Sequence, residues 1–171
     1  IVLTLGLKSS DKGIDFAIKA WGKLINTHFP ENSPERKKLV YLIAGEYHPG
    51  FVQDSPKEYK KCEEAIQRAI KEAKLRCIKI TNIEKLTRAE TEQNDVIIFE
   101  SFVDETLLKE LYAAGDIVIL PYRNIQQISS GNLADAFGFG KPTIATDFTH
   151  AGELLYPGDL RTAKRQLKTG K

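Results

Sequence analysis

The sequence predicts a doubly wound α/β domain, in which helices cover both faces of a parallel sheet. Its apolar runs are short and continuous rather than alternating, as in strands that are buried on both faces. Segments with helical spacing of apolar residues separate these runs, which is the pattern of right-handed βαβ units. The length of 171 residues suits one domain with a substantial core.

The first part of the chain predicts the order strand, helix, strand. Residues 1–5 form an apolar, β-branched run, as in a core strand. Asp11 is placed to cap a helix, because apolar residues then recur every three or four positions on one face. Pro30 ends that helix, and the run Leu39–Ala44 predicts a second strand, followed by a loop at 46–54.

The middle of the chain predicts a long helix and a third strand. Ser55 supplies an N-cap and Pro56 the first helical residue, and apolar residues follow on one stripe as far as Ala73. The run at 76–80 is typical of a strand. Residues 81–94 are polar, highly charged and without clear periodicity, so we interpret them as an inserted excursion.

The last part of the chain continues the alternation. Strands are expected at residues 96–99, 117–120 and 143–145. Asp104 caps a short helix between the first two of these strands, and apolar residues at 133–137 mark a helix between the last two. A short helix is expected at 153–155, and the tail at 160–171 is basic and can form a helix.

Composition excludes several classes of protein. The formal net charge is only +2, which leaves no basic surface for nucleic acid or an anionic membrane. No apolar stretch approaches the ~20 residues of a transmembrane segment. Cys62 and Cys77 form no disulfide framework, so we expect a reducing, cytoplasmic setting. The three histidines lack the spacing of metal ligands, so we expect no metal site.

Three loops that follow predicted strands are candidate ligand sites, because an open parallel sheet binds ligands at the carboxyl ends of its strands. They span residues 6–13, 45–54 and 121–131. The first loop carries Lys8 and Lys12, which can neutralise a phosphate, although a solvated surface turn has the same composition. In the second loop, His48 before a proline is more typical of a hydrogen-bonding loop residue than of a catalyst.

The third loop is the richest in polar groups and leads into a helix. Ser129 or Ser130 can serve as the N-cap, and Gly131 leaves the first free amides uncovered. Together with the helix dipole, these amides make an anion site that suits a diphosphate. Asp135 follows one helical turn later, where a carboxylate can bind the diol of a ribose. The alternative is an ordinary cap, with Asp135 only favouring the dipole.

Several motifs stand in a fixed order along the chain. They are Asp11-Lys12-Gly13-Ile14-Asp15, Ile43-Ala44-Gly45, Ala113-Ala114-Gly115-Asp116-Ile117, Leu120-Pro121-Tyr122, Gly140-Lys141-Pro142-Thr143-Ile144-Ala145-Thr146 and Glu153-Leu154-Leu155. Over most of the chain, this series resembles the C-terminal domain of group 1 (family 4) retaining glycosyltransferases. The resemblance implies a GT-B enzyme, in which two Rossmann-like domains face each other across a cleft and the C-terminal one binds the sugar nucleotide.

The resemblance also implies roles for single residues. The family has a Glu, seven residues and a second Glu before its Gly-Lys-Pro strand, and in this chain the two positions hold Gln127 and Asp135. By resemblance, Asp135 binds the ribose hydroxyls. Gln127 lies near the donor sugar, where a neutral amide departs from the family's acid. The amides of residues 129–131 would hold the diphosphate.

The first loop matches the family only in part. Lys12 corresponds to the family's diphosphate-binding lysine, whereas Leu7 stands where the family commonly has an arginine. Lys8 is the nearest substitute for that arginine, although a lysine cannot copy a bidentate guanidinium.

We therefore expect the donor-binding half of a retaining glycosyltransferase, which transfers a hexose from a nucleoside diphosphate sugar without a metal ion. Residues 1–171 would be one domain of a longer chain, since the sequence has no methionine and opens on a strand. An N-terminal domain would then complete the enzyme. One rival is a degenerate, non-catalytic domain of this fold, favoured by Gln127 and Leu7. Another is a free-standing α/β enzyme with a simple phosphate site at Lys12 and 129–131.

Overall fold

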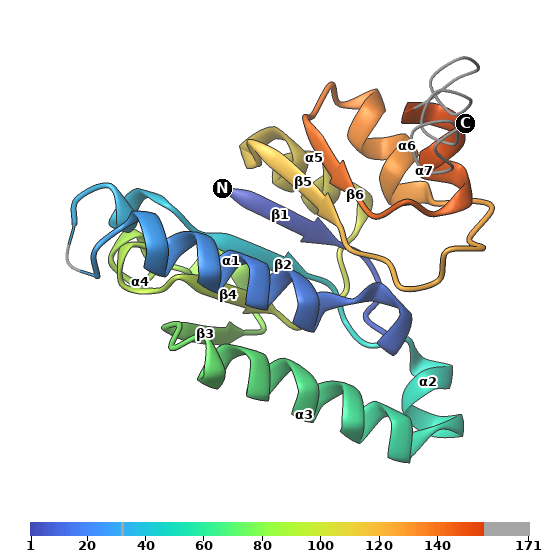
Figure 1. Ribbon diagram of the computed structural model, residues 1–171, viewed down its shortest axis with the longest axis horizontal. Coiled ribbons are helices and arrows are strands. Elements are labelled where there is room, and N and C mark those ends of the chain that lie inside the picture. Colours follow the sequence, from blue (N-terminus) through green and yellow to red (C-terminus); the bar gives the residue numbers. More distant parts are fainter. Residues whose placement is uncertain (32, 156–171) are drawn as a thin grey trace, which may run out of the picture.

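Six parallel strands form a single sheet within residues 1–31 and 33–155, the part of the chain that the computed structural model describes (Figure 1). The strands are β1 (Val2–Leu5), β2 (Tyr41–Ala44), β3 (Cys77–Ile80), β4 (Val96–Phe99), β5 (Ile117–Leu120) and β6 (Thr143–Ala145). Their order in the sheet is β3-β4-β2-β1-β5-β6. The predicted fold class is confirmed; the tail predicted at 160–171 lies outside the described residues.

Helices cover both faces of this sheet (Figure 1). One face packs against α1 (Ile14–His28) and α3 (Pro56–Glu72). The other packs against α5 (Glu105–Ala114), α6 (Gly131–Gly138) and α7 (Thr149–Leu155). All four residues of β2 and of β4 are buried, because these central strands are covered on both faces. Continuous apolar runs therefore predict these strands correctly.

The chain changes direction within the sheet next to β1. From β1 it passes to β2 and outward to β3, and after β4 it returns beyond β1 to β5 and β6. The topological switch point therefore lies between the carboxyl ends of β1 and β5. Open α/β sheets bind their ligands at such a point, and the first and third predicted loops both leave the sheet there.

The predicted start of α1 is wrong. Asp11 does not cap this helix: it lies in a 3₁₀ turn, Ser10–Lys12, and α1 begins at Ile14. Gly13 separates the two elements with a φ of 61°, a conformation that favours glycine. A Cβ on Gly13 would lie 2.0 Å from the carbonyl oxygen of Pro121. Close packing against the loop after β5 therefore sets where the helix begins.

Two segments predicted to be irregular contain short helices. α2 (Pro49–Asp54) lies in the predicted loop, and α4 (Arg88–Gln93) lies in the predicted excursion. Each has six residues, which is too short for apolar periodicity to show. A capping box between Thr87 and Glu90 begins α4, and it is the local signal that could have revealed this helix.

A buried ion cluster lies at the amino ends of the strands. Asp95 precedes β4, is 0% exposed, and accepts hydrogen bonds from Arg36 at 2.8 and 3.0 Å and from the Arg76 guanidinium at 2.9 and 3.1 Å. Burial alone would raise the pKa of the Asp95 carboxyl, but these bonds outweigh it and hold that pKa well below its ordinary value. Trp21 of α1 donates to the Asp95 carbonyl oxygen at 2.9 Å.

Candidate functional site

The loops that follow β1 and β5 pack against each other at the switch point. The Arg123 N–H donates to the Asp11 carbonyl oxygen at 2.7 Å, and the Arg123 guanidinium donates to the Asp15 carboxylate at 2.6 Å. Together with the contact between Gly13 and Pro121, these bonds bring the first and third predicted loops side by side. The structure thus assembles the candidate phosphate-binding groups from two loops that are far apart in the sequence.

The N-terminus of α6 is open at this point. Ser130 is its N-cap, since its Oγ accepts the Leu133 N–H at 3.2 Å, so the structure selects Ser130 over Ser129. Within the described residues, no protein group accepts from the N–H groups of Gly131 or Asn132. A Cβ on Gly131 would meet nothing within 4 Å. Two amides at the start of α6 therefore have no acceptor among the described residues, as an anion site at a helix start requires.

Asn132 fixes this helix start to the sheet. Its Nδ2 donates to the Leu5 carbonyl oxygen at 2.6 Å and to the Tyr122 hydroxyl at 3.3 Å. Gly6 makes room for it, because a Cβ there would lie 2.6 Å from Asn132 Nδ2. Sequence reasoning missed Asn132, since its partners come from two other elements.

Lys12 reaches the helix start through Tyr122. The Lys12 ammonium lies 3.9 Å from the centre of the Tyr122 ring, in a cation–π contact. The Tyr122 hydroxyl shares a hydrogen bond of 3.3 Å with Ser130 Oγ. Tyr122 is 2% exposed, so it acts as a buried spacer between the lysine and the helix cap. Tyr122 therefore contacts both Lys12 and the residue that caps α6.

Asp135 lies one turn into α6 and is half-buried. Burial raises the pKa of Tyr112, and the neighbouring Asp135 carboxylate adds to that effect. Within the described residues, no donor is bonded to this carboxylate. Its charge is therefore available at the same helix whose first amides are open.

Gln127 and His150 surround the loop before α6. Gln127 Nε2 donates to the Ser129 carbonyl oxygen at 2.8 Å, so its side chain is engaged by its own loop. The Ser130 N–H donates to His150 Nδ1 at 2.9 Å. Sequence reasoning left His150 unassigned, because only the fold brings α7 to this loop.

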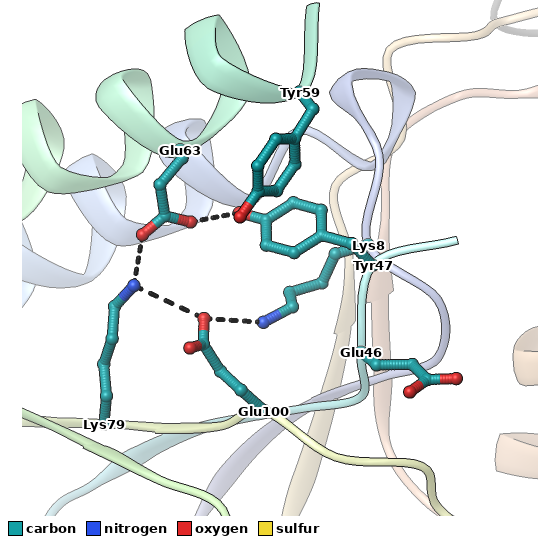
Figure 2. Close-up of a pocket in the computed structure, with 7 residues that line it drawn as sticks. All are labelled: Lys8, Glu46, Tyr47, Tyr59, Glu63, Lys79 and Glu100. Atoms are coloured by element: carbon teal, nitrogen blue, oxygen red, sulfur yellow. Dashed lines mark hydrogen bonds and ion pairs between the residues drawn. The ribbon is translucent and has the colours of Figure 1, made fainter. Parts of the chain in front are cut away.

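Lys8 is not at the helix start. Its side chain is 2% exposed and turns toward β3 and β4, where its ammonium donates to Glu100 at 3.0 Å and lies 4.6 Å from the centre of the Tyr47 ring (Figure 2). Burial lowers the pKa of Lys8, and the bond to Glu100 offsets part of that effect. The structure therefore places Lys8 and Lys12 in different surroundings.

Lys8 lines a cavity of about 240 Å³ on the α3 side of the sheet. Around this cavity, Lys79 is bonded to both Glu63 and Glu100, and Glu63 accepts from the Tyr47 hydroxyl (Figure 2). Cations and carboxylates alternate here and satisfy one another. Such a chain of ion pairs ties α3 to the ends of β3 and β4, and it leaves no net positive charge for a diphosphate.

Two features are absent from the described part of the chain. Residues 1–31 and 33–155 contain no group of three or more His, Cys, Asp or Glu side chains that could hold a metal ion. None of the helices within these ranges has the length and apolar character needed to cross a membrane.

Comparisons with known proteins bear on the family and the fold of the chain. The family described as glycosyl transferases group 1 matches residues 59–166. No curated protein sequence matches the chain. A UDP-forming α,α-trehalose-phosphate synthase from Burkholderia xenovorans has a similar structure (TM-score 0.59, 12% identity, covering 90% of this chain and 31% of that one). So has the trehalose-6-phosphate synthase OtsA (TM-score 0.60, 13% identity, 96% of this chain and 35% of that one).

These two likenesses concern the fold, and the chain spans about a third of the length of either synthase. The match to the family, in contrast, shows which family the chain belongs to. It runs from the first turn of α3 past the end of α7 and covers most of the chain, including α6 and the loop before it. We therefore conclude that this chain belongs to the group 1 glycosyltransferases.

Proposed function

We propose that the chain is the donor-binding domain of a retaining glycosyltransferase that transfers a hexose from a nucleoside diphosphate sugar. The observation that carries this proposal is the open N-terminus of α6 at the switch point, with Lys12 on the adjoining loop. Membership of the group 1 family supports a sugar-nucleotide ligand. The UDP-forming activity in the name of one similar structure makes UDP the first nucleotide to test.

Departure of the nucleoside diphosphate is the step that this site would assist. As the bond between the anomeric carbon and the diphosphate oxygen breaks, negative charge grows on the leaving group. The amides of Gly131 and Asn132 and the Lys12 ammonium can receive that charge without rearranging, and they can do so without a metal ion. Asp135 would accept hydrogen bonds from the ribose hydroxyls, which orients the diphosphate toward the amides.

A second domain would complete the enzyme. Since the chain spans about a third of the similar synthases, we propose that an N-terminal Rossmann-like domain supplies the other wall of the cleft and the acceptor site. We also propose a cytoplasmic location, which the free thiols of Cys62 and Cys77 support, because disulfides are rare there.

Calorimetric titration tests the donor site directly. UDP, GDP, ADP and inorganic pyrophosphate would each be titrated into the 171-residue chain, with and without EDTA. We expect one nucleoside diphosphate to bind more tightly than pyrophosphate, because only the nucleotide offers a ribose to Asp135, and we expect EDTA to leave its affinity unchanged. Absence of binding by all four ligands would refute the proposal.

A non-catalytic domain of the same family is the second candidate. It is favoured by the neutral Gln127 and by Leu7, which is 40% exposed where the family commonly has a charged side chain. The two candidates differ in one measurement, which is sugar transfer by a polypeptide that carries both domains.

A further inference from the structure

We propose that Gln127 and His150 are positioning residues, which hold the Ser129–Ser130 peptide in the orientation that the donor site requires. The inference rests on the proposed function, because this peptide immediately precedes the open amides of α6. It also gives Gln127 a role different from the donor-sugar contact that the family resemblance implies.

The Ser129–Ser130 peptide is held from both sides. Its carbonyl oxygen, on Ser129, accepts from Gln127 Nε2 at 2.8 Å, and its N–H, on Ser130, donates to His150 Nδ1 at 2.9 Å. The backbone N–H of His150 then donates to the backbone carbonyl oxygen of Gln127 at 3.1 Å. These three hydrogen bonds form a closed ring around one peptide, which we call the peptide clamp.

The peptide clamp matters because of what the peptide would do without it. A peptide in a loop can flip by rotation about the backbone torsions on either side of it. After the flip, its N–H and its carbonyl oxygen point in the opposite directions. Rotation of the Ser129 carbonyl toward the α6 amides would place a partial negative charge beside the diphosphate. It would also withdraw Ser130 from its capping position, since Ser130 Oγ accepts the Leu133 N–H at 3.2 Å. The clamp therefore keeps the anion site free of a competing acceptor.

The clamp explains why an amide is needed at position 127. A carboxylate has no proton to donate at neutral pH, so Glu at this position would face the Ser129 carbonyl with two acceptors at hydrogen-bond distance. The two oxygens would repel each other, and the loop would have to move. Gln127 is thus suited to this loop in a way that the family's acid is not.

His150 contributes an acceptor on the other side. Because Nδ1 accepts from Ser130, the neutral ring carries its proton on Nε2. An asparagine can place its Oδ1 near the position of Nδ1, so His150→Asn preserves the acceptor. His150→Leu keeps much of the side-chain volume and removes the hydrogen-bond acceptor. This pair separates the hydrogen bond from simple packing.

The first experiment compares two charge substitutions. Gln127→Glu and the matched control Gln126→Glu introduce the same charge at adjacent positions, and only Gln127 belongs to the clamp; Gln126 is exposed. Inorganic pyrophosphate and UDP would be titrated by calorimetry, with melting temperatures measured by circular dichroism. We expect the affinity of Gln127→Glu for both ligands to fall about tenfold, as for a lost hydrogen bond, and that of Gln126→Glu to change far less.

The second experiment uses the histidine pair and a spectroscopic signature. We expect His150→Leu to lose about tenfold in pyrophosphate affinity and His150→Asn to retain most of it. In the wild-type chain labelled with ¹⁵N-histidine, the unprotonated ring nitrogen of His150 should be Nδ1, assigned by its disappearance in His150→Asn. A purely structural role would shift the melting temperatures of the variants and leave the affinity of the folded fraction unchanged.

The outcomes distinguish this inference from the proposed function. If the wild-type chain binds neither pyrophosphate nor UDP, both are refuted together. If it binds them and Gln127→Glu binds as tightly or more tightly, Gln127 is not a clamp residue and the inference alone is refuted. Protonated Nδ1 on His150 at neutral pH would refute it as well. If His150→Leu does not fold, the Gln127→Glu and Gln126→Glu pair still decides.

Discussion

At the scale of single residues, the proposed donor site depends on the absence of a side chain at Gly131. Gly131→Val adds a side chain beside the open amides, where a Cβ has no neighbour within 4 Å, so we expect the fold to tolerate it. The phosphate oxygens would lose one or more hydrogen bonds to these amides. We expect pyrophosphate and UDP affinity, measured by calorimetry, to fall about ten- to a hundredfold.

Gly138→Val is the matched control for this substitution. Gly138 lies at the other end of the same helix, and a Cβ there also meets nothing within 4 Å. Equal affinities of the two variants would show that the anion does not bind at the start of α6.

Asp135 should distinguish ligands that carry a ribose from those that do not. A hydrogen bond to a charged group contributes roughly 1.5–3 kcal/mol, so Asp135→Ala should weaken UDP binding about tenfold or more. Pyrophosphate binding should change little, or strengthen slightly, because a negative charge near the site is removed. Parallel titrations of both ligands measure the difference. Similar losses for UDP and pyrophosphate would place Asp135 with the phosphates or with the fold.

The two lysines of the first loop show what a sequence can and cannot reveal about single residues. Both Lys8 and Lys12 follow a strand end, and composition alone cannot tell them apart. Their fates differ because Lys8 turns to one side of β1 and is buried between Tyr47 and Glu100, whereas Lys12 stays half-buried on the other side, over the ring of the buried Tyr122. Those partners lie 39 to 110 residues away along the chain, and only the fold brings them near.

At the scale of elements, the cluster around Asp95 joins the segments that precede β2, β3 and β4. Asp95→Asn would leave Arg36 and Arg76 without their counter-charge in a buried setting. Removing one partner of a buried ion pair typically costs about 3–5 kcal/mol, so we expect a loss of that order in unfolding free energy at pH 7. Urea unfolding measures it. Asp147→Asn, at an exposed aspartate, is the control.

The same cluster should make stability depend on pH in a defined direction. The pKa of Asp95 is lower in the folded chain than in the unfolded chain, where it is about 3.9. The ionised carboxyl therefore stabilises the fold above that pH, and the contribution is lost as the pH falls further. The stability difference between wild type and Asp95→Asn should shrink between about pH 5 and pH 2. A difference that stays constant over this range would contradict the assignment.

Helix boundaries show where local signals suffice. Asp104 caps α5 as the local sequence predicts, and Ser130, one of the two serines that the sequence offers, caps α6; each accepts from a backbone N–H within its helix. The start of α1 was mispredicted, since the contact between Gly13 and Pro121 overrides the capping preference of Asp11. Local patterns therefore predict an element well until a distant loop competes for its first turn.

At the scale of the whole molecule, we expect the 171-residue chain to bind a nucleoside diphosphate and to transfer no sugar. Positioning of two reactants can account for about 7–11 kcal/mol of barrier lowering, and a single domain would lack the wall that positions the acceptor. The measurement is incubation with radiolabelled UDP-sugar and a mixed acceptor preparation, with an active two-domain group 1 enzyme as control. Turnover by the chain at a rate near that of the control would contradict the two-domain proposal.

The fold class was predictable because continuous apolar runs mark buried parallel strands. The sheet order was not, since nothing local shows that β4 lies between β3 and β2. The residues of the proposed donor site likewise fall into a predictable and an unpredictable group. The helix start and the lysine of the proposed donor site stand in contiguous motifs, whereas Asn132, Tyr122 and His150 act through contacts between elements.

The sequence has one tryptophan, and its position provides a built-in fluorescent reporter. Trp21 is 4% exposed, lies 6.1 Å from the Tyr41 ring and donates to the Asp95 carbonyl oxygen, so it sits at the amino ends of the strands. The proposed donor site lies at their carboxyl ends. The fluorescence emission of Trp21 should therefore shift to the red when the chain unfolds and stay unchanged when a nucleotide binds. Loss of structure and loss of binding can thus be followed as separate optical signals in the same sample.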